Sequence, residues 1–276
     1  MTTSFLIAQI SDLHIKAGGR LSYRRVDTLV ALQRTIDRLN RLQPRPDVVV
    51  ITGDLVDFGR ADEYVTLRAA LAALDMPYYL IPGNHDDRQA LRQAFPELTH
   101  LHGHPEFVQW CIEDYPVRLI GLDSTVPGQS HGELCHHRLS WLDERLAEQP
   151  DKPTLVMLHH PPFVSGIGHM DVQRLLNSDE LAAVIRKHTQ VERVLCGHLH
   201  RSIQQRFGGS IVCCCPGTAH QVALDLNPDA EACFVMEPPG YLLHCWTPEQ
   251  AMITHLGMIE TFDGPYPFYD ENGLID

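Results

Sequence analysis

The sequence lacks any apolar run approaching the roughly 18 residues of a membrane-spanning helix, so no membrane association is expected. The apolar segment 5–10 is also too short for the core of a secretory signal, and the acidic Asp12 follows it closely. We therefore expect a cytoplasmic location, where cysteines stay reduced. The eight cysteines include no Cys-x-x-Cys pair, so a thiolate zinc site is not expected. Four of them lie in apolar, strand-like runs, which predicts buried free thiols.

Positive charge is scarce. Lys and Arg total 22 against 35 Asp and Glu, which gives a net charge of −13. A protein that follows the phosphates of a nucleic acid usually presents a basic face, so no nucleic-acid partner is expected. A small anionic substrate remains compatible with this charge, because bound metal cations can be the largest local charges in a site.

Two common catalytic motifs are also missing. The chain has no G-x-S-x-G elbow and no P-loop with its phosphate-binding lysine. Their absence removes the usual templates for acyl transfer and for hydrolysis of nucleoside triphosphates.

The sequence does contain apolar segments that alternate with amphipathic ones. Its 276 residues, 44% of them hydrophobic, are enough for one elaborated α/β domain with a large core. We predict a main domain over residues 1–224, with closing strands and a C-terminal cap or tail over 225–276 in the same structural unit. The expected strands are 4–10, 48–51, 78–81, 117–122, 154–158, 193–196, a hairpin over 203–215, 241–246 and 252–259. The expected helices are 24–42, 62–74, 136–148 and 179–188.

Asp54 follows the apolar run 48–51, which reads as a buried strand. Gly53 ends that strand and allows a tight turn. Open α/β sheets place their chemistry at this carboxyl end of a core strand. Asp57 would orient a ligand or cap the next helix. Four other apolar runs end in residues of metal-binding type, and together these motifs predict Asp54 as a ligand shared by two metal ions. They are Asp12-Leu13-His14, Asn84-His85-Asp86, His159-His160 and Gly197-His198-Leu199-His200.

Spacing suggests how these side chains point. Asp12 and His14 are two residues apart, as are His198 and His200. In an extended segment such pairs point to the same side, so the first pair suits one ion, and the second pair can serve two ions, one histidine each. The adjacent His159 and His160 would point apart, so His159 is predicted to face the metals and His160 to be a supporting or structural group.

The ligand types indicate the chemistry. Asn84 offers an amide oxygen without charge, and His85 beside it can lie close to a metal-bound phosphate without being a ligand. A mixed set of oxygen and nitrogen ligands suits Fe, Mn, Zn or Co and does not choose between them. Two such ions can generate a hydroxide nucleophile and bind both oxygens of an in-line displacement at phosphorus. No Ser, Cys or His nucleophile is then needed.

With these motifs in this order from Asp12 to His200, the chain resembles the calcineurin-like metallophosphoesterases. The resemblance implies a four-layer α/β/β/α sandwich with a dinuclear site at the strand ends. His85 then corresponds to the phosphate-side histidine of the family. The resemblance also implies the ligands of each ion: Asp12, His14, Asp54 and His200 for one, and Asp54, Asn84, His159 and His198 for the other.

Within that superfamily the chain is most similar to bacterial class III cyclic-nucleotide phosphodiesterases and to glycerophosphodiesterases. Residues 216–221 and 269–272 look more like the second group. The likeness implies a metal-dependent phosphodiesterase that hydrolyses small, glycerophosphodiester-like substrates with broad tolerance, by attack of a metal-bridging hydroxide. The alternative is a 3′,5′-cyclic nucleotide (cAMP) phosphodiesterase. A phosphomonoesterase or pyrophosphatase, a nuclease and a non-catalytic metal-binding scaffold are weaker readings; the charge of −13 counts against the nuclease, and the complete ligand set against the scaffold.

The same likeness extends to substrate contacts and assembly. It implies that Tyr23 and His220 contact the substrate, together with Asn84 and His85. Phe58 and Pro82 stand near places where the protein phosphatase branch carries arginines, so a phosphoprotein substrate is not expected. The tail from residue 263 has no helical or strand period, and we expect it to clasp a neighbouring element or a partner chain, giving a homo-oligomer such as a dimer or an assembly of dimers.

Overall fold

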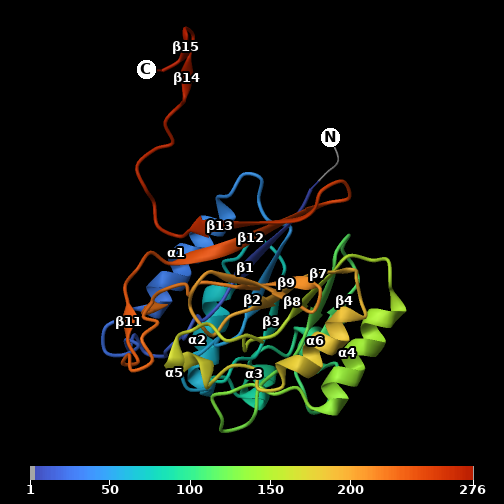
Figure 1. The fold of residues 1–276 in the computed structure, drawn as a ribbon. Helices are drawn as coiled ribbons and strands as arrows, with labels where there is room; N and C mark the ends of the chain where they lie inside the picture. The colour runs from blue at the N-terminus through green and yellow to red at the C-terminus, as the bar shows by residue number, and fades with distance from the viewer. Residues whose placement is uncertain (1–3, 276) are drawn as a thin grey trace.

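Two β-sheets packed against each other form the centre of the molecule (Figure 1). The computed structural model describes residues 4–275. One sheet has the order β13-β12-β1-β2-β3 and the other the order β4-β5-β6-β7-β9-β8, with the short pairs β10–β11 and β14–β15 apart from them. The strands are β1 (Phe5–Ile10), β2 (Val48–Thr52), β3 (Tyr78–Ile81), β4 (Trp110–Ile112), β5 (Arg118–Gly121), β6 (Thr154–Met157), β7 (Val191–Cys196), β8 (Ile203–Phe207), β9 (Ser210–Cys214), β10 (Gln221–Val222), β11 (Phe234–Val235), β12 (Gly240–Thr247), β13 (Ala251–Met258), β14 (Tyr269–Asp270) and β15 (Gly273–Leu274).

The helices cover the outer faces of the two sheets. They are α1 (Thr28–Asn40), α2 (Ala61–Leu71), α3 (Arg88–Ala94), η1 (Thr99–His102), α4 (His136–Glu148), α5 (Gly168–Asp171) and α6 (Ser178–Arg186). Helices α1, α2 and α3 contribute to a core with the first sheet, and α4, α5 and α6 to a core with the second. A third apolar cluster lies between the sheets. The predicted α/β/β/α order of layers is therefore confirmed.

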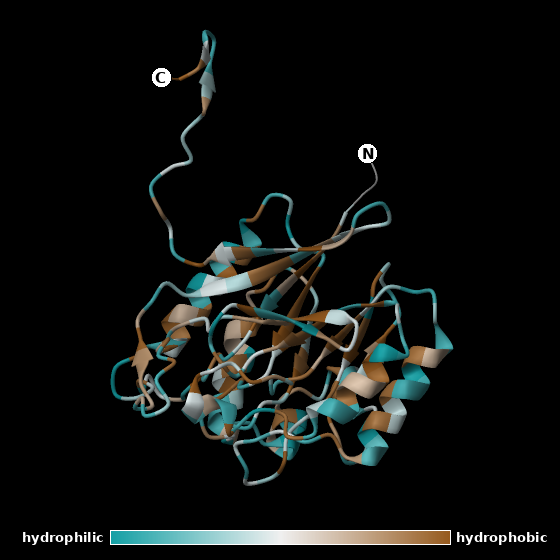
Figure 2. Cartoon of the chain, in the orientation of Figure 1, coloured by the Kyte–Doolittle hydropathy of each residue, from teal (hydrophilic) through white to brown (hydrophobic). Residues whose placement is uncertain are grey.

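The apolar strand sequences explain this sandwich. Every residue of β1 and β2 is buried, and the two strands pair in parallel, as expected for strands covered on both faces. Strand β12 adds to β1 in the antiparallel sense, so the C-terminal strands continue the first sheet. Figure 2 shows the inner strands of the sandwich largely in hydrophobic colours, and α4 and α6 with hydrophilic and hydrophobic stretches in alternation.

Helix α1 begins later than predicted. Tyr23 and Arg24 have positive φ, so the chain is still turning there, and the Asp27 side chain caps the helix by accepting from the Val30 N–H. Its apolar positions Leu32, Ile36 and Leu39 then face the first sheet.

The sequence did not predict the shorter elements, because segments of two to seven residues carry too little periodicity. These are α3, η1, α5, β4 and the pair β10–β11.

The C-terminal tail leaves the body of the molecule after β13. Residues 262–275 are exposed, and the β14–β15 hairpin stands away from both sheets (Figure 1). The expectation that the tail clasps a neighbouring element of its own chain is therefore wrong, while a contact with a partner chain stays a prediction. None of the helices within residues 4–275 is long and apolar enough to cross a membrane.

Candidate metal centre

The predicted ligands converge because the strands that carry them end at one side of the sandwich. Asp12 and His14 follow β1, Asp54 follows β2 and Asn84 follows β3, all in the first sheet. The second sheet supplies the remaining three, since His159 follows β6 and His198 and His200 follow β7. Loops from both sheets thus meet over the core that joins them.

The backbone at most of these ligands is left-handed and not extended. Five of them have positive φ: Asp12 (58°), His14 (45°), Asp54 (48°), His198 (71°) and His200 (48°). The prediction that extended segments would aim each pair is therefore wrong. Residues other than glycine reach this conformation at a cost of order 1–3 kcal/mol each. Here the hydrogen bonds Asp12 N–Gly53 O (3.1 Å) and His14 N–Asp54 O (2.9 Å) hold two of the loops together.

Glycine is required at position 53, beside Asp54. Gly53 has φ of +94°, and a Cβ there would run into the His159 ring and the Gly83 backbone. The turn after β2 can therefore bring Asp54 against His159 only because residue 53 has no side chain.

Asp54 lies between the two halves of the cluster. Its Oδ2 is 3.6 Å from His14 Nε2 and 3.4 Å from His159 Nε2. Ligands bound at about 2.0–2.2 Å to one ion lie roughly 3.0–3.5 Å from one another. A single carboxylate at this spacing from nitrogens of both halves has the position that a bridging ligand needs.

The distances between the other candidate ligand atoms fall in the same range. In one half, His200 Nε2 is 3.1 Å from His14 Nε2 and 3.5 Å from Asp12 Oδ1. In the other, His159 Nε2 is 3.2 Å from both Asn84 Oδ1 and His198 Nδ1. All of these residues are buried except the half-buried Asn84. The residues present therefore fit two transition-metal ions, and the seven-residue assignment stays a proposal.

The charges in this cluster also favour bound cations. Burial alone would raise the pKa of Asp54, but His159 and His85 hold it well below its usual range. Burial likewise opposes protonation of His159, yet Asp54 raises the pKa of that ring to about 9. Burial raises the pKa of Asp12 to about 6 and lowers that of His200 to about 3. Without metal, buried groups of the cluster must share protons that cations would displace.

Hydrogen bonds to the second ring nitrogen orient two of the histidines. His159 donates from Nδ1 to the Thr52 carbonyl at 2.8 Å, and His200 donates from Nδ1 to the His220 carbonyl at 3.1 Å. Such contacts fix the tautomer and leave Nε2 as the free lone pair. Of the two roles considered for Asp57, orientation fits: its Oδ1 lies 3.3 Å from His14 Nδ1, and α2 begins after Arg60 instead.

His160 is closer to the cluster than the sequence suggested. One ring nitrogen each of His159, His160 and His198 lie within 4.8 Å of one another. The argument that adjacent histidines must point apart fails, because β6 ends at Met157 and the chain bends afterwards. His160 is fully buried and its Nδ1 lies 2.8 Å from Ser124 Oγ. A supporting role remains the prediction for it.

His85 lies in a turn at the edge of the cluster, so its direction does not come from an extended segment either. Its backbone N–H donates to Asp54 Oδ1 at 3.0 Å, and its Nδ1 donates to the Asp57 carbonyl at 2.8 Å. Nε2 is then left for a ligand in the cavity. The neighbouring Asp86 has a structural role, because it accepts from the N–H groups of Leu55 and Gly83.

A cavity of about 400 Å³ opens over the metal-ligand cluster, and Tyr23 and His220 line it as well. The predicted ligands and neighbours that line it are His14, Asp54, Asn84, His85, His198 and His200. The Tyr23 ring lies 5.0 Å from the Phe234 ring and 5.3 Å from the His220 ring, which gives one aromatic wall. Burial and then Asp57 raise the pKa of Tyr23 to about 12, so its hydroxyl stays protonated. His169 and Gln173, in and just after α5, complete the cavity. Sequence reasoning missed these two residues and Phe234, because short elements carry them.

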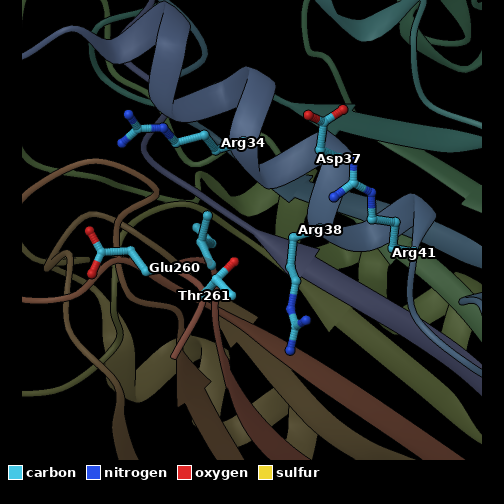
Figure 3. A pocket seen from close by; sticks show the side chains of 7 residues that line it. Arg34, Asp37, Arg38, Arg41, Glu260 and Thr261 are labelled. Atoms are coloured by element: carbon cyan, nitrogen blue, oxygen red, sulfur yellow. The ribbon is translucent and has the colours of Figure 1, made fainter. Parts of the chain in front are cut away.

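A second cavity of about 430 Å³ lies against α1 on the outside of the first sheet (Figure 3). Arg34, Arg38 and Arg41 line it, but Asp37 and Glu260 lie among them. None of the predicted ligands or substrate contacts lines this cavity. Similar size therefore does not make it a rival site, and the convergence of ligand residues identifies the first cavity as the candidate.

Comparison with known proteins agrees with this geometry. The model of the family described as Calcineurin-like phosphoesterase matches residues 5–202, which include every ligand proposed above. A protein of Arcobacter nitrofigilis named Probable glycerophosphodiester phosphodiesterase GpdQ is 45% identical over 273 residues, covering 98% of this chain and 100% of that protein. A probable cyclic nucleotide phosphodiesterase of Rhodopseudomonas palustris is 35% identical, covering 93% of each.

The fold also recurs among solved structures. A dimetal phosphatase from Danio rerio superposes with a TM-score of 0.63 at 15% identity, covering 93% of this chain and 99% of that one. At that identity the likeness supports the fold alone.

Proposed function

The chain belongs to the calcineurin-like phosphoesterase family, and we propose that it hydrolyses small phosphodiesters, preferably glycerophosphodiesters, at a centre of two metal ions. The observation that carries the proposal is the position of Asp54, whose Oδ2 lies within 3.6 Å of a ring nitrogen in each half of the cluster. A carboxylate so placed is within reach of two ions, one in each half.

Bound metal ions supply Lewis acidity and a hydroxide nucleophile at neutral pH. The chain supplies the remaining functions. Asn84 and His85 stand side by side at the edge of the cavity, and the free Nε2 of His85 can donate to a phosphoryl or leaving oxygen once protonated. Tyr23 and His220 form the wall on which the alcohol portion of a diester would rest. Fe, Mn, Zn and Co all suit the donor set.

Similarity favours a glycerophosphodiester substrate over a cyclic nucleotide. The relative bearing the glycerophosphodiesterase name matches the chain at 45% identity over the whole of its length, against 35% for the relative with the cyclic-nucleotide name. The second activity remains the alternative, because the relative with the cyclic-nucleotide name also covers 93% of this chain. Initial rates on glycerophosphocholine, cAMP and a phosphomonoester, measured side by side, decide between them.

Metal removal tests the proposal directly. We expect that dialysis against a chelator abolishes hydrolysis of bis(p-nitrophenyl) phosphate, and that Mn, Fe, Zn or Co restores it, since the donors cannot polarise water alone. Elemental analysis of the same samples should show two ions per chain at full activity. Full activity in protein shown to be metal-free would refute the proposal.

Assembly can be tested independently of activity. The exposed tail carries Phe262, Tyr266, Phe268 and Tyr269, each at least 57% exposed, and aromatic surface of this kind marks interaction sites. We propose that it packs on a partner chain and expect sedimentation at micromolar concentration to give a mass well above the chain mass of 31.1 kDa. Deleting residues 263–276 should return the protein to a monomer. A full-length monomer would contradict this proposal.

A further inference from the structure

Gln9 is a polar residue inside an otherwise apolar core. On β1, Phe5 and Ile7 face the second sheet, and the period of two along a strand places Gln9 on the same face. Its side chain is fully buried. A buried amide is tolerated where its hydrogen bonds are satisfied, so its partners indicate what it does.

The amide of Gln9 joins strands of both sheets. Its Nε2 donates to Thr52 Oγ1 on β2 and to the Cys196 carbonyl on β7, both at 3.0 Å. Its Oε1 accepts from His244 Nε2 on β12 at 3.1 Å. His244 Nδ1 lies 2.9 Å from Thr254 Oγ1, and burial lowers the pKa of this ring to about 3. The neutral ring therefore donates to Gln9 and accepts from the Thr254 hydroxyl.

Two of these partners directly precede the loops of the metal centre. Thr52 is followed by Gly53 and Asp54, and its carbonyl also accepts from His159. Cys196 is followed by Gly197 and His198. We propose that Gln9 is a positioning residue, which fixes the separation between the metal-binding loops of the first sheet and those of the second. This inference rests on the proposed function and adds a residue that is itself no ligand.

A residue that only fills the core would not fix the separation between the metal-binding loops, and Ile7 provides the comparison. It lies two positions earlier on the same strand, is fully buried between the sheets, and has an apolar side chain. Truncating it should weaken the packing of the sheets without removing any hydrogen bond to Thr52 or Cys196.

The test compares Gln9→Met, which keeps length and removes the three hydrogen bonds, with Ile7→Ala. Metal-free protein is titrated with Co²⁺, followed by visible absorption and calorimetry, and Tm is recorded. Changes behind a metal's ligands typically weaken affinity about 10–100-fold, and we expect that loss for Gln9→Met, with a smaller loss for Thr52→Val. Ile7→Ala should lower Tm while its Co²⁺ affinity stays that of the wild type.

The outcomes separate this inference from the proposed function. If Gln9→Met lowers Tm but binds Co²⁺ as tightly as the wild type, Gln9 is a core residue and the inference is overturned while the metal centre stands. If the wild type binds no Co²⁺, the metal centre itself is overturned and this role with it. Should Gln9→Met not fold, Gln9→Glu replaces it, because a carboxyl group of the same shape has at most one donor and must lose the hydrogen bond to Thr52 Oγ1 or to the Cys196 carbonyl.

Discussion

Asp54→Ala is expected to bind neither metal ion and to fall to the activity of chelated protein. The carboxylate is buried and within 3.6 Å of His14 and His159, so its loss removes a donor from both halves of the cluster at once. It also removes the acceptor of the His85 N–H. The loss should therefore exceed the roughly 10–100-fold typical of residues behind the ligands. Rates on a diester and elemental analysis of the purified variant measure it.

Two matched variants make the result specific. Asp62→Ala removes a carboxylate at the start of α2 whose side chain is 58% exposed, and it should keep both metals and full activity. Asn84→Ala removes a neutral metal-ligand candidate whose Oδ1 lies 3.2 Å from His159 Nε2, in one half of the cluster, so we expect weakened binding of one ion and normal binding of the other. Two ions per chain in Asp54→Ala would show that this residue bridges nothing.

The sequence was sufficient to predict which side chains converge, for a simple physical reason. Strands buried on both faces are largely apolar, so the first Asp, Asn or His after each run stands at a strand end. Parallel strands end at the same edge, and the loops after β1, β2 and β3 must then be neighbours. The glycines before Asp54 and His198 were likewise visible as turn signals.

The direction in which each ligand side chain points could not be predicted from the sequence in the same way. The alternation rule holds only inside a strand, and Asp12, His14, His198 and His200 all lie beyond the strand ends with positive φ. That conformation is imposed by hydrogen bonds between loops distant in sequence, such as His14 N to Asp54 O. The α5 and β11 walls of the cavity and the network around Gln9 also depend on contacts between distant segments, which local patterns do not encode.

His85→Ala is expected to keep both metal ions while hydrolysis slows by about 10²–10⁴-fold, the usual contribution of a positioned acid–base group. His85 reaches the site without belonging to the proposed ligand set: its Nδ1 is committed to the Asp57 carbonyl, and its ring lies edge-on to His14 at 4.7 Å. Only Nε2 is left to act on substrate. Elemental analysis establishes the metal content, and His137→Ala, on the outer helix α4, provides a histidine control.

The leaving group separates the two roles open to that nitrogen. If Nε2 protonates the departing alkoxide, the loss in His85→Ala should shrink for a p-nitrophenyl diester, because nitrophenolate leaves without a proton, and stay large for an alkyl diester such as glycerophosphocholine. If Nε2 instead donates a hydrogen bond to charge developing on the phosphoryl oxygens, both substrates should lose the same factor. A variant that matches the wild type on both diesters would leave His85 with its turn-forming contacts to Asp54 and Asp57 and no part in the chemistry.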